Sequence, residues 1–102
     1  MVPQPSKAER RAAREAVGAY HGAELEKLLD RVRDGLARHD AGEIDAFELD
    51  EMIHHFHRAS QKLWSFCVGC RGGGPSSAGT IEWMKAEGEL PDWWEISDPR
   101  RR

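Results

Sequence analysis

Residues 44–70 read IDAFELDEMIHHFHRASQKLWSFCVGC, and this stretch decides the fold. It holds the strongest helix-start signal of the chain, because Asp45 can accept from the free N–H groups of a first turn and Glu48 stands at the capping-box position. The apolar residues that follow recur at spacings of three and four, which is typical of an amphipathic helix. This helical face comprises Leu49, Met52, Ile53, Phe56, Leu63 and Cys67, with Ser60 at the same spacing. We expect a helix over about 45–68, with more apolar surface than one neighbour can cover.

A longer helix is predicted before this stretch, over about residues 7–40. Ser6 can cap it, and apolar residues keep a helical period from Val17 to Leu36. A bend or break near Gly18–Gly22 stays open, since each glycine costs about 1 kcal/mol relative to alanine. Gly42 provides a turn between the two helices, and so short a connection makes them antiparallel neighbours. The basic start of the first helix should then overhang the second.

The remainder of the chain divides by composition. Residues 1–6 are expected to be a disordered N-terminus, residues 71–79 (RGGGPSSAG) a Gly/Ser/Pro linker, and residues 99–102 a basic end. Between the last two, residues 80–98 should form a short helix, capped by Ser77 or Thr80, and a tail that docks on the hairpin. Asp92 begins the last turn of this tail, which carries two adjacent tryptophans. The expected fold is therefore all-α: a long antiparallel hairpin, a short third helix and a Trp-bearing C-terminal tail.

Length and charge limit the possible functions. The chain has 102 residues and a net charge of −3, with 39% hydrophobic and 32% charged residues, which indicates one domain whose modest core a partner can complete. Both ends are basic and the middle is acidic, with six acids and no base in residues 40–51. Two cysteines, no signal-peptide pattern and no apolar run of about 20 residues predict a cytoplasmic protein.

The histidines and cysteines suggest a metal site. His54 and His57 precede Cys67 and Cys70 in the pattern H-x2-H-x9-C-x2-C, and two imidazoles with two thiolates suit tetrahedral zinc. The competing interpretation is structural. In it, the histidines lie on a helix flank and Cys67 is buried in the core, because Cys67 continues the apolar stripe. A straight helix would also place His54 and Cys70 about 24 Å apart, so one zinc could bind both pairs only if the helix folded back or a second chain contributed.

Calcium binding has less support. Residues 42–49 are similar to the second half of an EF-hand loop, but Ala37, His39 and Ala41 stand where oxygen ligands are needed. The helix start at Asp45 and Glu48 explains the same residues.

Four basic residues near the N-terminus are candidates for nucleic-acid contact: Lys7, Arg10, Arg11 and Arg14. They could follow a phosphate backbone from one helix. A solvated helix end is the competing interpretation, since the chain is acidic overall and no aromatic residue lies among these arginines.

Catalysis is not expected. His54, His55 or His57 could act as a base and Cys67 as a nucleophile, but His57 and Cys67 would lie about 15 Å apart on one helix. The glycines at 72–74 follow a helix instead of preceding one, so they do not form a phosphate-binding loop.

The segments GEIDAFELDEMIHHFHRA and DWWE, with the LW and FC pairs of residues 63–67, resemble short proteins of high-GC actinobacteria. The resemblance implies an all-helical cytoplasmic protein without an assigned activity, and it transfers no catalytic residue.

These observations predict a non-enzymatic interaction or adaptor protein without a cofactor, acting as a homodimer or with another helical protein. Its expected interaction surface comprises Phe47, Phe56, Trp64, Trp83, Trp93 and Trp94. The alternative is a regulator that binds zinc through His54, His57, Cys67 and Cys70, or DNA through the basic N-terminal helix.

Overall fold

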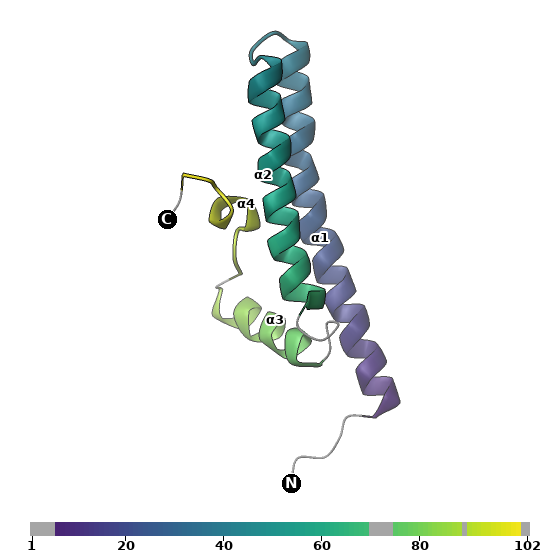
Figure 1. Cartoon of the computed structure of the whole chain (residues 1–102). Helices are drawn as coiled ribbons and strands as arrows, with labels where there is room; N and C mark the ends of the chain where they lie inside the picture. The colour runs from purple at the N-terminus through teal and green to yellow at the C-terminus, as the bar shows by residue number, and fades with distance from the viewer. Residues whose placement is uncertain (1–5, 70–74, 89, 101–102) are drawn as a thin grey trace.

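The computed structural model describes residues 6–69, 75–88 and 90–100. These residues form the predicted all-α fold, a long antiparallel hairpin with two shorter helices beside it (Figure 1). The elements in chain order are α1 (Lys7–Asp40), α2 (Ala46–Trp64), the π-helical turn η1 (Ser65–Gly69), α3 (Pro75–Glu87) and α4 (Trp93–Ile96).

The two hairpin helices begin where local sequence signals predict. Ser6 accepts a hydrogen bond from the backbone N–H of Glu9 at 3.1 Å, and Asp45 accepts one from that of Glu48 at 2.8 Å. Gly42 has a φ of 77° in the connection, a left-handed conformation that glycine adopts without steric cost. Helix α1 runs without interruption past Gly18 and Gly22, so the question of a break there is answered.

The core lies between the middle of α1 and the C-terminal half of α2, and it extends to η1, α3 and α4. Its buried members are Val17, Tyr20, Leu28, Ala59, Leu63, Cys67, Ile81 and Trp93. Two contacts fix the register of the hairpin: the rings of Tyr20 and Phe66 meet edge to face, and Gly35 lies against the side chain of Met52.

Helix α3 begins earlier than the sequence predicts. Pro75–Gly79 are helical, whereas the expected linker extended to residue 79, and neither Ser77 nor Thr80 is a cap. The physical reason is that proline suits the first turn of a helix, where its missing N–H costs nothing. The rest of the predicted linker, residues 71–74, lies outside the described residues, as do residues 1–5 and 101–102 of the predicted ends.

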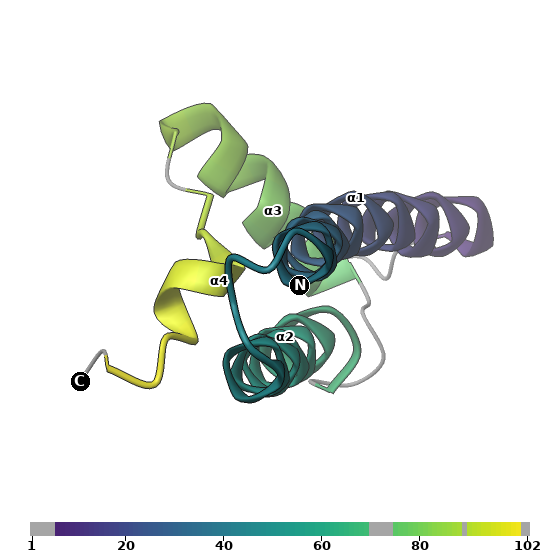
Figure 2. The ribbon, with the colours of Figure 1, turned by 90° about the horizontal axis from the view of Figure 1, so that it is seen from above.

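The molecule is a rod with principal extents of 60 × 27 × 23 Å. Helix α4 and most of α3 lie on one side of the hairpin, and along α2 no described helix lies on the opposite side (Figure 2). The N-terminal part of α1 extends beyond the end of α2 (Figure 1). Among the described helices, none is both long enough and apolar enough to span a bilayer.

Candidate functional site

Helix α2 holds the C-terminal tail through donors on one of its flanks. His55 Nε2 lies 2.7 Å from the carbonyl oxygen of Trp94, Lys62 Nζ donates to that of Ile96 at 2.9 Å, and Arg58 Nε donates to that of Ser97 at 3.5 Å. The final carbonyls of a helix have no partners within it, so Lys62 and Arg58 supply donors to Ile96 and Ser97 at the end of α4, while the Trp94 carbonyl also accepts from the Ser97 N–H. The tail is therefore docked by main-chain recognition as well as by its tryptophans.

The two tryptophans of α4 contact both helices of the hairpin. Trp93 is buried, and its Nε1 donates to the Tyr20 hydroxyl at 2.9 Å. Trp94 stacks on the His55 ring with 3.7 Å between centroids, and the Arg31 guanidinium lies 5.5 Å from the Trp94 ring centroid. The predicted docking of the tail is confirmed, and His55 is the histidine of α2 that packs on a tryptophan.

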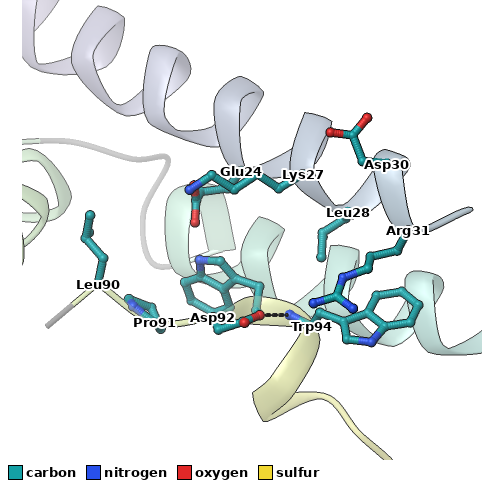
Figure 3. A pocket seen from close by; sticks show the side chains of 10 residues that line it. Glu24, Lys27, Leu28, Asp30, Arg31, Leu90, Pro91, Asp92 and Trp94 are labelled. Atoms are coloured by element: carbon teal, nitrogen blue, oxygen red, sulfur yellow. Dashed lines mark hydrogen bonds and ion pairs between the residues drawn. The ribbon is translucent and has the colours of Figure 1, made fainter. Parts of the chain in front are cut away.

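A pocket of about 470 Å³ remains where α4 crosses α1 (Figure 3). Its charged groups already have partners. Glu24, a buried carboxylate, pairs with Lys27 at 2.7 Å, and Asp30 pairs with Arg33. Asp92 accepts from the N–H groups of the first turn of α4. The pocket is therefore part of the contact between the tail and α1. Its carboxylates are poorly suited to acid–base chemistry, because they already have partners.

The three predicted zinc ligands that lie in the described residues, His54, His57 and Cys67, are not brought together into one group. His54 and His57 are exposed on α2, and His54 Nδ1 lies 2.9 Å from the Asp50 carbonyl oxygen. Cys67 is fully buried, and this burial, with a smaller contribution from Glu24, raises the pKa of its thiol to about 11. A neutral thiol is a poor metal ligand. Cys70 lies outside the described residues, and those that are described contain no group of three or more potential ligands.

The residues that resemble half an EF-hand are engaged in the turn and the helix start. Gly42 supplies the left-handed turn residue, and the Asp45 carboxylate caps α2. Because Gly42 and Asp45 already have these structural roles, their positions do not favour a calcium site.

The four basic residues near the N-terminus are exposed on the overhanging part of α1. Arg11 forms an ion pair with Glu15 at 3.3 Å, both side chains being largely exposed. Contact of this segment with nucleic acid stays a prediction.

The six aromatic residues do not form one surface. Trp93 is buried, and Phe56 and Trp94 are half-buried. Phe47 is 82% exposed at the start of α2, Trp64 is 53% exposed at its end, and Trp83 is 58% exposed on α3. Phe47 and Trp64 are left exposed in the single chain, and the tail docks on the flank of α2 opposite Trp64.

A different set of apolar side chains lines the side of the hairpin opposite α4, and we call it the open face. Its members are Leu25, Leu29, Val32 and Leu36 of α1 and Ile53, Phe56 and Trp64 of α2, of which Leu25 and Phe56 also pack against the core. Helical geometry places them there: Ile53 and Trp64 lie roughly half a turn around α2 from the tail-binding flank of His55 and Lys62. Leu36 is 46% exposed and Ile53 is 44% exposed.

Sequence reasoning missed the tail-binding flank and the buried Glu24. The spacing of His55, Arg58 and Lys62, three donors on one helical flank, together with a tail rich in tryptophan, was the available signal. Nothing in the sequence around Glu24 marks its burial, which depends on the tail crossing above it.

Comparisons of the chain with protein-family models, with curated proteins and with solved structures give no match.

Proposed function

We propose that the protein is a non-enzymatic helical interaction module of the cytoplasm, and that the open face is its binding surface. One observation carries this proposal: Trp64, Ile53 and Leu36 are about half exposed on a flank that no described helix covers. Contiguous exposed apolar side chains are typical of interaction sites, and tryptophan is enriched among the residues that dominate binding.

The tail supports this assignment by contrast. The tail covers the opposite flank of the hairpin, and its polar groups form hydrogen bonds there with α1 and α2. That flank therefore has few unoccupied groups that a partner could bind. The acidic groups around the pocket of Figure 3 have partners as well, and the Arg31 guanidinium lies over the Trp94 ring, which favours binding over catalysis.

Photo-cross-linking in the cells that produce the protein tests the proposal. A benzophenone amino acid at position 64 should give covalent adducts with a second polypeptide chain, whether another copy or a different protein. The matched control is the same amino acid at position 83, because Trp83 is equally exposed but lies on α3. Absence of adducts at position 64, or equal adducts at both positions, would contradict an interaction surface on the open face.

A second candidate function is nucleic-acid association through Lys7, Arg10, Arg11 and Arg14. Their exposure on the overhang of α1 favours it, because exposed basic side chains on one helix can follow a phosphate backbone. Duplex DNA should then be retarded at low salt, and deletion of residues 1–14 should abolish the retardation.

A further inference from the structure

We propose that a second copy of this chain, in antiparallel orientation, covers the open face. This inference rests on the proposed function and names its partner. Three properties of α1 support it: the charges at the two ends of the rod, the flank on which they lie, and the size of the side chains between them.

The rod has ends of opposite charge. The overhang carries Lys7, Arg10, Arg11 and Arg14 against one glutamate within residues 7–14, and the hairpin tip has six acids and no base within residues 40–51. Arg10 and Asp40 are about 45 Å apart along α1, many times the Debye length of about 8 Å at physiological salt, so these charges cannot neutralise each other within one chain. An antiparallel pair brings each basic end to the acidic tip of the other copy, whereas a parallel pair brings like charges together.

Three of the four basic side chains, Lys7, Arg11 and Arg14, lie on the same flank of α1 as the open face, whereas Arg10 shares the angular position of the buried Leu28. Lys7 and Leu25, Arg11 and Leu29, Arg14 and Val32, and Gly18 and Leu36 are each separated by 18 residues. Eighteen residues make about five complete helical turns, so each pair shares one angular position. Lys7 and Arg14 form no ion pair with any other residue in the described ranges.

Side-chain size along this flank is complementary to itself. Gly18 and Gly22 lie in the N-terminal half of this flank, and no atom of a neighbouring element lies within 4 Å of a Cβ built at either position. The larger residues Leu29, Val32 and Leu36 lie in its C-terminal half. No packing within the described chain accounts for two exposed glycines that each cost a helix about 1 kcal/mol. They leave a notch that the larger residues of an antiparallel copy fit.

The charges and the notch give the same register. A two-fold axis that brings Arg10 to the level of the partner's Asp40 crosses α1 at Leu25, halfway between them. The same axis brings Gly18 to the level of Val32 and places Gly22 near the level of Leu29 of the other copy. Because Tyr20 faces Phe66 in the hairpin, Trp64 lies near the level of Gly22 and therefore close to the axis.

Light scattering of the full chain at micromolar concentration tests the dimer, and we expect twice the mass of one chain. Gly22→Leu should raise the dissociation constant roughly 30-fold or more, the range of a lost hot-spot contact. It should leave the protomer folded, since the new side chain enters open space and leucine favours helix. Trp64→Glu should also dissociate the dimer, whereas Trp83→Glu should not. Circular dichroism confirms the fold of each variant.

Chemical cross-linking tests the orientation. In a Cys70→Ser background, Arg10→Cys and Asp40→Cys chains are mixed and treated with a short bismaleimide. The antiparallel pair predicts cross-links between the two variants, and predominant Arg10→Cys self-cross-links would overturn it.

Other outcomes separate this inference from the proposed function. A monomeric chain whose position 64 still cross-links to another protein would overturn the homodimer and keep the interaction surface. A monomer that retards DNA through residues 7–14 would instead assign the basic end to nucleic acid and remove the charge argument for a second copy.

Discussion

His55 of α2 and Trp94 of α4 meet twice: their rings stack with 3.7 Å between centroids, and His55 Nε2 lies 2.7 Å from the Trp94 carbonyl oxygen. The stack lies on the ring face of Trp94, and the hydrogen bond lies at the C-terminal end of α4. One side chain therefore fixes both the orientation of the tryptophan and the position of the helix that carries it.

Replacing His55 should loosen the tail. We expect His55→Ala to lower the free energy of unfolding by about 1–3 kcal/mol, because it removes one aromatic stack and one hydrogen bond. Urea denaturation measures the loss, and hydrogen exchange should show faster exchange in residues 93–97. The matched control is His54→Ala, whose side chain is exposed, with an expected change below about 0.5 kcal/mol. Equal losses in the two variants would show that His55 has no special role.

The bond between Trp93 and Tyr20 should contribute to stability because both groups are buried. Tyr20→Phe leaves the indole N–H without its acceptor, and we expect a loss of about 1–3 kcal/mol in the free energy of unfolding. A double-mutant cycle with Trp93→Phe should give a coupling energy of about 1 kcal/mol. Trp83→Phe controls for loss of indole alone and should be nearly neutral, since Trp83 is exposed. Additive effects of the two substitutions would contradict a contribution from this hydrogen bond.

The parts of the fold that sequence predicts are those with local causes. Asp45 and Glu48 start α2, Gly42 forms the turn, and Asp92 caps α4, because each signal involves residues at most three positions apart. The apolar stripe of α2 likewise predicts which side faces α1, as the burial of Leu63 and Cys67 confirms.

The candidate site depends on long-range packing, which the stripe does not determine. His54, His55 and His57 look alike in sequence, yet only His55 is buried, because the tail arrives on that flank of α2. Because the tail docks on the flank of His55, Trp64 on the opposite flank stays exposed. A wide apolar face predicts that a second contact exists, but the flank that receives it is set by the connection through α3.

Gly35 is the glycine of α1 that packs directly against side chains of α2. A Cβ there would lie 2.9 Å from the end of the Met52 side chain and 3.3 Å from Leu49 Cδ1. We expect Gly35→Leu to lower the free energy of unfolding by about 1–3 kcal/mol through overpacking. Gly22→Leu is the matched control and should stabilise the protomer by a few tenths of a kcal/mol or more, measured in the Trp64→Glu background so that dimerisation does not contribute. A neutral Gly35→Leu would mean that Met52 and Leu49 can move aside freely.

Cys67 should behave as a structural thiol whose ionisation opposes folding. Its pKa rises from an ordinary value near 9 to about 11 because burial disfavours the thiolate. The folded state therefore holds this proton more tightly than the unfolded state, so the contribution to stability is complete below pH 9 and is lost as the pH rises towards 11. In a Cys70→Ser background, the urea midpoint should fall across this range, and it should fall less when Cys67→Ala is added.

Thiol reactivity checks the same conclusion at pH 8. Native Cys70→Ser protein should react with a disulfide reagent far more slowly than the same protein in urea, because Cys67 is fully buried and protonated. Fast reaction of the native thiol would contradict its burial and would reopen metal or redox chemistry at this cysteine. Slow reaction leaves Cys67 as part of the core that joins α1, α2 and the docked tail.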